Sequence, residues 1–432
     1  MTGTPKRAFF PDAMSKPVNS PSSRKAEACP SGPRVGSIVI YPAMGSSDSD
    51  ARFLCALAGY SKSLFRHFSP SARLEHIVFT NLKGAAPRVF QDQGMTVSEC
   101  WRKNHLLYWT DIFRNIRKYP SLRVVHLQHE FNQFGGVLTV PFIPVMLAVL
   151  RHVFRKRIAV TFHEVLSPEQ LDKEFIKNTL IPFPRGVARV LFRWYYRLTS
   201  ALADVVFVQD ELFENTLKRY GVTTSIQIAR IGADTAVVLP PKDAARSNLK
   251  IALNRKVLLF FGALDWRKGL DVLFDAFGRL PRGEYLLVIA GGQPPRIRDT
   301  PQYIAWHARL LEKAAGFGDE IMMLGFVDDR DISGLFAASD LVVLPYIVPQ
   351  KVSAVLNLAA SHETPCIASS FLSGQADARG LFEPGPDALK AKVEWSFNNL
   401  DLLRRMAIDF KRKYDWRVTA AVIEQAYQSL IN

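Results

Sequence analysis

The chain has 432 residues and a formal net charge of +15, with 48% hydrophobic and 22% charged residues. This length exceeds one ordinary core and predicts two domains, and the balanced composition excludes a globally disordered chain. The positive charge favours an anionic partner: a nucleic acid, a membrane surface or a phosphorylated substrate. Four scattered cysteines without CxxC spacing argue against a zinc site and a disulfide framework, and they favour a reducing cytoplasm.

The first residues and the longest apolar run raise the question of export or membrane insertion. Residues 1–34 are rich in Pro, Ser, Lys and Arg and contain no apolar run of signal-peptide length, so we expect a flexible basic tail. Residues 135–150 are apolar but interrupted by prolines, and they fall short of the ~18 residues that span a bilayer. We expect a buried strand-to-helix element here, with a membrane-touching edge as the alternative.

Apolar runs of strand length then alternate with helix-length segments. A strand over 36–43 is followed by a Gly/Ser loop and by a helical pattern over 51–67. Further strands are expected at residues 73–82, 122–130, 157–164, 203–210 and 225–234. This alternation predicts a parallel, doubly wound sheet in a Rossmann-like domain over 35–236.

A Pro pair and mixed charges interrupt this pattern and predict an interdomain linker at 237–254. Continuous apolar strands resume at residues 256–264, 284–292, 321–327, 341–346 and 365–370. Such strands are typical of a sheet that is covered on both faces. We therefore expect a second α/β domain over 255–412, and a C-terminal helix over 413–432 that could return to the N-terminal domain.

Two cations stand where an anion would bind in such a sheet. Ligands bind beyond the carboxyl ends of parallel strands, and Arg267 and Lys268 come directly after the strand "VLLFFGAL". Arg offers a fork to phosphate oxygens and Lys a point charge, so a diphosphate would fit both. A solvated basic turn is the alternative, and spacing alone does not separate the two.

A second phosphate-compatible element begins at Ser353. Serine is a favoured N-cap, and the helical run after it would point the backbone amides of Ala354 and Val355 outward. An ordinary capped helix is the alternative.

Five blocks of the second half occur in an order that resembles a known family. They are "FFGALDWRKGLDVLFDAF", "LLVIAGG", "LGFVDDRDISGLFAASDLVVLPY", "SAVLNLAASHETPCIAS" and "YDW". This order resembles the nucleotide-binding half of the group-1 glycosyltransferases of glycosyltransferase family 4. Looser matches at "TFHEV" and "IGAD" extend the resemblance to roughly residues 36–432. The resemblance implies the α/β GT-B fold, in which two Rossmann-like doubly wound domains face a central cleft.

The resemblance implies an enzyme that moves a sugar from a UDP- or GDP-linked donor to a glycan or lipid-linked saccharide in polysaccharide biosynthesis. We expect no cofactor beyond this co-substrate and no metal, because the acidic triplet at 48–50 lies away from the expected phosphates. A non-catalytic scaffold of the same fold and a sugar-nucleotide epimerase are the alternatives. Nucleic-acid binding is not expected, since the chain has no helix-turn-helix or stacked-aromatic motif.

The resemblance also assigns residues. Donor-binding residues would be Gly262, Arg267, Lys268, Phe326, Val327, Lys351, Ser353, Ala354, Val355 and Leu356. Of these, the turn at Gly325, Phe326 and Val327 would contact the base. His163 would lie near the transferred sugar, and the loop at Gly45 and Ser46 would border donor and acceptor.

A protein base is needed only if the reaction inverts the sugar configuration, and most family members retain it. Glu130 and Glu164 are the candidates, since both follow expected strands. For His129 and Glu130, a polar pair in a loop is the alternative.

The chain departs from the family at three positions. Gln350 and Leu358 replace two glutamates that normally reach the sugar hydroxyls and the ribose, and Glu363 replaces a glycine. The helix start "SAVL" resembles the "SGVL" of a bacterial exopolysaccharide-type subset, which favours an active variant.

Four arginines at four-residue intervals would form one stripe on a helix. They are Arg185, Arg189, Arg193 and Arg197, and the apolar remainder is Val187, Val190, Leu191, Trp194 and Leu198. A basic amphipathic helix with aromatics predicts contact with an anionic membrane surface, and so a cytoplasmic protein on the inner face of a membrane. A packed helix with a solvated arginine face is the alternative.

Overall fold

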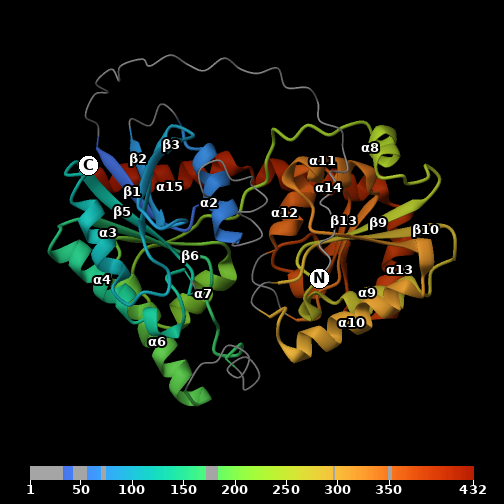
Figure 1. Cartoon of the computed structure of the whole chain (residues 1–432), viewed down its shortest axis with the longest axis horizontal. Helices are drawn as coiled ribbons and strands as arrows, with labels where there is room; N and C mark the ends of the chain where they lie inside the picture. Colours follow the sequence, from blue (N-terminus) through green and yellow to red (C-terminus); the bar gives the residue numbers. More distant parts are fainter. Residues whose placement is uncertain are drawn as a thin grey trace. The chain divides into compact units, whose positions relative to one another are not determined.

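The computed structural model describes residues 33–41, 56–69, 74–131, 133–171, 183–294, 297–348 and 353–432. The chain divides into two compact units (Figure 1). Unit 1 holds residues Ala233–Asp415, and unit 2 holds the described residues up to Gly232 together with Trp416–Asn432. Both are α/β units built on a largely parallel sheet, which confirms the predicted fold class.

The sheet of unit 2 has the strand order β3-β4-β2-β1-β5-β6-β7-β8. Its strands are β1 Arg34–Ile38, β2 Glu75–Asn81, β3 Arg88–Asp92, β4 Met95–Trp101, β5 Leu122–His129, β6 Arg157–Phe162, β7 Val205–Val208 and β8 Ile226–Ile228. All neighbours are parallel except β3 and β4, a hairpin that the sequence analysis missed. Its turn uses Gln93 and Gly94, both with positive φ, as two-residue hairpin turns require.

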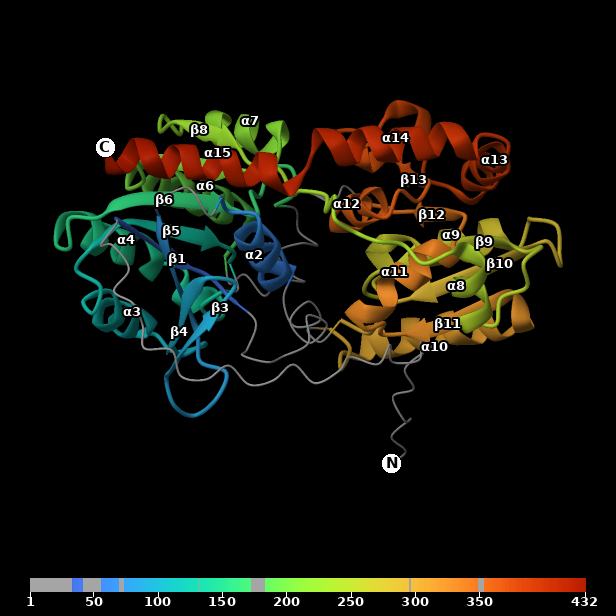
Figure 2. The same ribbon diagram turned by 90° about the horizontal axis from the view of Figure 1, so that it is seen from above.

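Helices cover the unit 2 sheet. They are α2 Ala56–Arg66, α3 Tyr108–Ile116, α4 Phe142–His152, α6 Arg185–Ala201, α7 Glu211–Arg219 and α15 Trp416–Ile431. The apolar run at 135–150 contains no strand; it forms a 3-10 turn, Val137–Thr139, and then α4. Pro144 is tolerated there because the first turn of a helix needs no amide donor. The C-terminal α15 packs on α2 and β5, so it belongs to the N-terminal unit (Figure 2).

The sheet of unit 1 is parallel throughout, with the order β11-β10-β9-β12-β13-β14. Its strands are β9 Lys256–Phe261, β10 Tyr285–Ala290, β11 Ile321–Gly325, β12 Leu341–Leu344, β13 Cys366–Ser369 and β14 Leu381–Phe382. The order reverses beside β9, which has β10 on one side and β12 on the other. Such a switch point is where ligands bind in open parallel sheets.

Alternate residues of β9 enter two different cores. Leu258 and Phe260 pack on one face of the sheet, and Val257 and Leu259 pack on the other. The first core is completed by α9 Leu270–Phe277, α10 Pro301–Ala315 and α13 Pro386–Phe397, and the second by α8 Lys242–Asn248, α11 Asp329–Ala338 and α12 Ala354–Ser361. α14 Leu400–Lys413 contributes to both. Burial on both faces explains why the central strands β9, β10 and β12 are apolar at almost every position, with Lys256 at the start of β9 the exception.

The segment expected to be a linker, residues 237–254, is instead part of unit 1. It contains α8, whose Arg246 is buried and donates to Asp340 at 2.7 Å and to the Ala338 carbonyl at 3.0 Å. The chain passes between the units next to Gly232 and again next to Asp415. The Pro pair and mixed charges therefore belong to a segment that contains a short helix with a buried arginine. The composition of this segment resembles that of a linker.

Candidate functional site

The loops after the central strands of unit 1 are hydrogen-bonded to one another at the carboxyl edge of the sheet. The Gly262 amide, after β9, donates to the Ala290 carbonyl at 2.8 Å. The Gly291 amide, after β10, donates to the Gly325 carbonyl at 2.7 Å. The predicted position Gly262, after β9, and Gly325, at the end of β11, thus lie on either side of β10 at the edge where such sheets bind ligands.

Arg267 lies in a 3-10 turn between β9 and α9, Trp266–Lys268, and it is tied to Asp265. Asp265 accepts from the Arg267 amide at 2.9 Å and from its guanidinium Nε at 3.0 Å. Burial alone would raise the pKa of Asp265, but the hydrogen bonds and charge of Arg267 hold that pKa below its ordinary value. The arginine side chain is 58% exposed and already paired, so it is a weaker anion anchor than its charge suggests.

Lys268 differs, because its ammonium lies against the backbone of Gly262. A Cβ on Gly262, whose φ is +124°, would lie 2.4 Å from Nζ of Lys268. The ammonium is also 5.9 Å from the centre of the Tyr346 ring. Burial lowers the pKa of Lys268 to about 8, while Asp265 raises it and Arg267 lowers it further. Lys268 is half-buried, and a cation partly shielded from water gains more from a bound anion than a fully exposed one.

Gly269 fixes the loop after β9 against the loop after β12. Its φ is +72°, and a Cβ would lie 1.9 Å from the carbonyl oxygen of Pro345. The Ile347 amide donates to the Arg267 carbonyl at 3.1 Å. Only glycine fits this close approach, which holds the turn of Lys268 in place.

Ser353 precedes α12 as predicted, but it does not cap the helix through its side chain. Its hydroxyl lies 3.2 Å from the hydroxyl of Tyr346. Its amide donates to Oε1 of Gln375 at 2.7 Å. The sequence analysis expected a cap hydrogen bond because it could not place Tyr346 within reach of the serine.

The first turn of α12 begins beside Gly262. Cγ2 of Val355 lies 3.7 Å from where a Gly262 Cβ would stand, whereas Leu356 is buried in the core. Ala354 is exposed, and within the described part of the chain the amides of Ala354 and Val355 contact no acceptor. Gly262, Lys268 and the start of α12 therefore form one cluster.

The two side chains predicted to contact a base are placed differently. Phe326 is 45% exposed, but Val327 is only 7% exposed and packs in the core. They follow Gly325, whose φ is +66°. Only Phe326 therefore presents its side chain outward from this turn.

The unexplained departure at Glu363 has a structural reason. Its φ is +51°, a conformation that suits the glycine usual in the family. The Glu363 carboxylate accepts from Nζ of Lys411 at 3.0 Å, and Lys411 is buried. The glutamate thus provides the buried Lys411 with a carboxylate that a glycine would lack. The other described departure, Leu358, packs partly buried against the core.

We expect Glu363→Gly to be more stable than Glu363→Ala by about 1 kcal/mol, because glycine relieves the positive φ and alanine does not. Both variants lose the ion pair to Lys411, so their difference isolates the backbone. Urea unfolding of both variants measures it. Equal stabilities would mean that the backbone at this position is not strained.

In unit 2, His163 follows β6 and is held by two glutamines. Nε2 lies 2.8 Å from Oε1 of Gln128, and Nδ1 lies 2.8 Å from Nε2 of Gln209. An amide oxygen only accepts and an amide nitrogen only donates, so Nε2 carries the proton. Burial, followed by the neighbouring His126 and His129, lowers the pKa of His163 to about 3. The ring is neutral, and neither nitrogen can act as a base while these bonds hold.

Sequence reasoning missed the partners of His163. Gln128 lies at the end of β5 and Gln209 directly after β7, so both flank His163 from neighbouring strands. The ring of Tyr60, from α2, meets the imidazole edge-on with centroids 4.5 Å apart. Polar residues at the carboxyl ends of three adjacent strands were the available signal.

Glu130 and Glu164 are both half-buried; Glu130 directly follows β5, and Glu164 lies two residues after the end of β6. His129 is not a loop residue; it ends β5, is fully buried, and pairs through Nε2 with the Tyr195 hydroxyl. Burial lowers its pKa to about 3, so it too is neutral.

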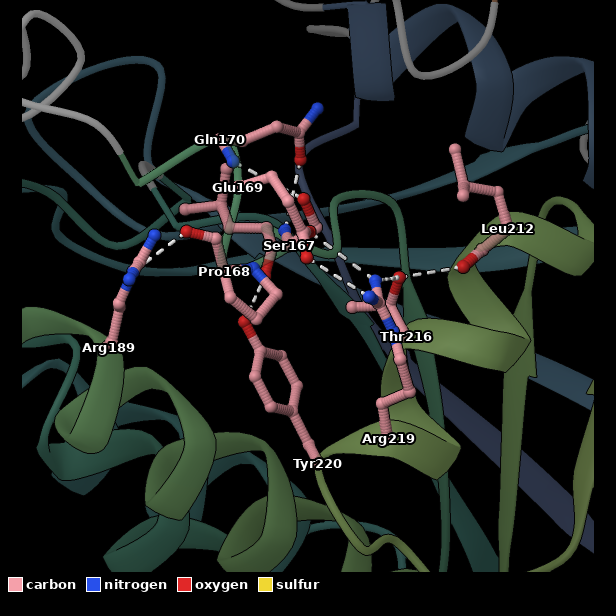
Figure 3. Close-up of polar contacts among 10 residues, drawn as sticks. Ser167, Pro168, Glu169, Gln170, Arg189, Leu212, Thr216, Arg219 and Tyr220 are labelled. Atoms are coloured by element: carbon pink, nitrogen blue, oxygen red, sulfur yellow. Dashed lines mark hydrogen bonds and ion pairs between the residues drawn. The ribbon is translucent and has the colours of Figure 1, made fainter.

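The segment that follows Glu164 is anchored by helices α6 and α7 (Figure 3). Nε of Arg189 donates to the Pro168 carbonyl at 2.8 Å, and a guanidinium nitrogen of Arg219 donates to Glu169 at 3.1 Å. The Tyr220 hydroxyl, just past α7, donates to the Leu166 carbonyl at 2.6 Å. Arg189 therefore holds a loop rather than facing solvent.

Some predicted positions lie outside the described residues: Gly45, Ser46, the acidic triplet at 48–50, Gln350 and Lys351. Within the described ranges, no group of three or more His, Cys, Asp or Glu side chains is placed to hold a metal ion. Likewise, no helix in those ranges is long and apolar enough to span a bilayer.

Residues 255–399, which lie within unit 1, match the family model described as Glycosyl transferases group 1. A phosphatidyl-myo-inositol mannosyltransferase of Mycobacterium leprae is 26% identical over 188 residues, which are 40% of this chain and 47% of that protein. An uncharacterized glycosyltransferase of Methanocaldococcus jannaschii is 25% identical over 184 residues, 40% of this chain and 44% of that protein. The chain thus matches less than half the length of these relatives.

Solved structures share the whole fold. Sucrose-phosphate synthase from Thermosynechococcus elongatus superimposes with a TM-score of 0.70 and 16% identity, covering 92% of this chain and 99% of that one. Anabaena HepE in complex with UDP-glucose gives a TM-score of 0.66 and 17% identity, with coverage of 92% and 99%. The fold is the GT-B fold of glycosyltransferases.

Proposed function

We propose that this chain is a glycosyltransferase that moves a sugar from a nucleoside-diphosphate sugar to a glycan or lipid-linked saccharide. The observation that carries the proposal is the desolvated ammonium of Lys268 against Gly262, within the residues that match the group-1 family. The UDP-glucose complex of the structural neighbour HepE and the mannosyltransferase name of the M. leprae relative support a UDP- or GDP-linked donor.

Lys268 has the main role in this proposal. Its ammonium and the outward amides of Ala354 and Val355 would stabilise the charge that develops on the departing nucleoside diphosphate. Arg267 would assist after exchanging part of its contact with Asp265 for a phosphate oxygen. Phe326 would stack on the base. These groups supply positive charge without a metal ion, and the proposal uses none.

The replacement of the family's two glutamates by Gln350 and Leu358 limits the contacts that can be proposed for the donor. Leu358 offers no oxygen to a ribose, so the proposal assigns the ribose no carboxylate at this position. The helix start at Ser353 and Ala354 keeps the small residues that leave its amides open, which supports an active variant rather than a scaffold.

The role proposed for His163, Glu130 and Glu164 of unit 2 depends on whether the reaction retains or inverts the sugar configuration. A retaining reaction needs no protein base, and the neutral His163 with both nitrogens occupied would then shape the subsite of the transferred sugar. Glu130 and Glu164 remain the candidate bases for an inverting reaction. We also propose polysaccharide or glycoconjugate biosynthesis as the process, and the cytoplasmic face of a membrane as the place, because the proposed acceptors include lipid-linked saccharides.

The test is a transfer assay with the purified chain, radiolabelled UDP- and GDP-sugars, and extracted lipid-linked saccharides. We expect label to enter the lipid or glycan fraction as free nucleoside diphosphate appears. A donor whose sugar is epimerised without acceptor would favour the epimerase alternative. Nucleotide binding without release of nucleoside diphosphate for any donor would favour the scaffold.

The affinity for nucleoside diphosphate is expected to fall as pH rises through about 8. The anion binds the protonated form of Lys268, and burial lowers the pKa of this group to about 8, so the favourable charge is present below that pH and lost above it. Titration calorimetry with UDP and GDP between pH 6.5 and 9.5 should show about a tenfold weaker affinity per pH unit at the alkaline end. A flat profile would contradict the role of Lys268.

A further inference from the structure

Helix α6, Arg185–Ala201, turns polar and small side chains inward and apolar side chains outward. Its buried residues are Ala188, Tyr196, Thr199 and Ser200. The Tyr196 hydroxyl donates to the Glu164 carbonyl at 3.1 Å and accepts from the Leu166 amide at 2.9 Å. Its ring stacks on Tyr220 with centroids 5.7 Å apart. The inward face therefore needs no further apolar partner.

The outward face carries the apolar residues that the packed-helix alternative would have buried. Trp194 is 60% exposed, Val190 54% and Leu198 53%, and Val187 and Leu191 are also exposed. At 100° per residue these five side chains lie within one sector of the helix. An apolar stripe of this kind on the outside of a helix marks an interaction surface. Figure 1 shows α6 at the edge of unit 2.

Arginines run along one margin of this stripe. Arg193 is exposed, and the guanidinium of the half-buried Arg197 lies 5.1 Å from the centre of the Trp194 ring. At 100° per residue, Arg185 lies on the opposite side of the helix from the stripe. Arg189 is the exception, since it holds the loop at Pro168. The helix contains no Asp or Glu, and across the described part of the chain none of its arginines forms an ion pair with a carboxylate.

We propose that this face of α6 docks on an anionic lipid bilayer, with the apolar stripe in the interface and Arg193 and Arg197 on the headgroups. The helix has 17 residues and is about 25 Å long, so it would lie in the plane of the membrane rather than cross it. Tryptophan is suited to this depth because its ring is apolar and its N–H is polar.

Charge decides between a bilayer and a second copy of the chain. In a symmetric dimer the same face meets itself, and α6 has no carboxylate to pair with the arginines of a second α6. Phosphate headgroups would pair with both arginines at the margin of the stripe, Arg193 and Arg197. The net charge of +15 acts in the same direction at longer range. This inference needs no nucleotide or acceptor, so it stands or fails separately from the proposed transfer reaction.

Vesicle flotation of the full chain tests the inference. We expect binding to vesicles of equal parts phosphatidylcholine and phosphatidylglycerol, weaker binding to phosphatidylcholine alone, and release as salt rises. Each arginine near an anionic surface contributes about 1 kcal/mol, or ~5-fold in partition, so Arg193→Glu with Arg197→Glu should lower binding by at least ~25-fold. Leu191→Ser with Trp194→Ser should lower binding to both vesicle types by at least ~10-fold.

Matched controls separate the surface from bulk charge and hydrophobicity. Arg404→Glu with Arg405→Glu makes the same charge change on α14 of unit 1, where both arginines are exposed. Leu253→Ser with Ile304→Ser removes two exposed apolar side chains from unit 1. Both controls should bind vesicles nearly as the parent does. The inference is overturned if the α6 variants bind as well as their controls, or if light scattering shows a dimer that the α6 variants abolish.

Discussion

Lys268→Ala is expected to lower kcat/KM for the nucleotide-sugar donor by about 100-fold or more, because it removes a desolvated cation from the place where the leaving diphosphate develops charge. The loss should appear with every donor that the parent accepts. Stability should not fall, since burial already disfavours this ammonium and lowers its pKa to about 8. Donor turnover and thermal unfolding of the same preparation measure the two effects.

Two comparisons make this result specific. Lys256 begins β9 at the opposite edge of the sheet and pairs with Glu284 at 2.9 Å, so Lys256→Ala should leave kcat/KM nearly unchanged. Arg267→Ala should cost less than Lys268→Ala, because the arginine is exposed and already paired with Asp265. Equal losses for Lys256→Ala and Lys268→Ala would contradict the assignment of the phosphate site.

Acid is expected to destabilise unit 2 from about pH 6.5 downward. His126 and His129 are fully buried, and burial lowers the pKa of each to about 3. Between pH 6.5 and about 3 the unfolded chain binds protons that the folded chain does not, so the stability present at neutral pH is lost as pH falls. His163 and His76 act in the same way, because burial lowers their pKa values to about 3 and about 4. Four such groups give a slope of about 5 kcal/mol per pH unit in the free energy of unfolding near pH 5.

Urea unfolding between pH 7 and 5 measures this slope. In His129→Gln the slope should fall by about 1.4 kcal/mol per pH unit, because the amide preserves a hydrogen-bonding group near Tyr195 but does not titrate. His152 lies exposed at the end of α4, and His152→Gln should keep the parent slope. A parent slope near zero would mean that the buried imidazoles are protonated in the folded chain.

The sequence predicted the sheets better than the loops, for a physical reason. Strands buried on both faces, such as β9 from Val257 onward and β10, are apolar at successive positions, so their runs are visible in the sequence. In the β3–β4 hairpin the edge strand β3 buries only Phe90, and the buried β4 includes Thr96, Ser98 and Glu99, so neither strand shows a continuous apolar run. The short α8 has the composition of a linker, since it contains a charged residue, Arg246, that is nevertheless buried. The sequence does not reveal this burial, because the partner of Arg246 is Asp340, 94 positions away.

The candidate site was predictable where position along a strand decided the chemistry. Lys268 and His163 follow strand ends, and the structure places both at the carboxyl edges of their sheets. The sequence could not rank Arg267 against Lys268, since the ranking depends on Asp265 and on the space left by Gly262. It also could not find Gln209, whose contact with His163 joins residues 46 positions apart.

The most direct test of the central claim is amide hydrogen exchange of the whole chain with and without a saturating nucleoside diphosphate, UDP and GDP in turn. In the parent chain, one of the two nucleotides should slow amide exchange in two short segments of unit 1, residues 262–269 and Ala354–Leu356. In the Lys268→Ala variant the same nucleotide should not slow exchange in these segments. Protection confined to other segments, or equal protection in Lys268→Ala, would contradict the proposal that Lys268 and the start of α12 hold the diphosphate.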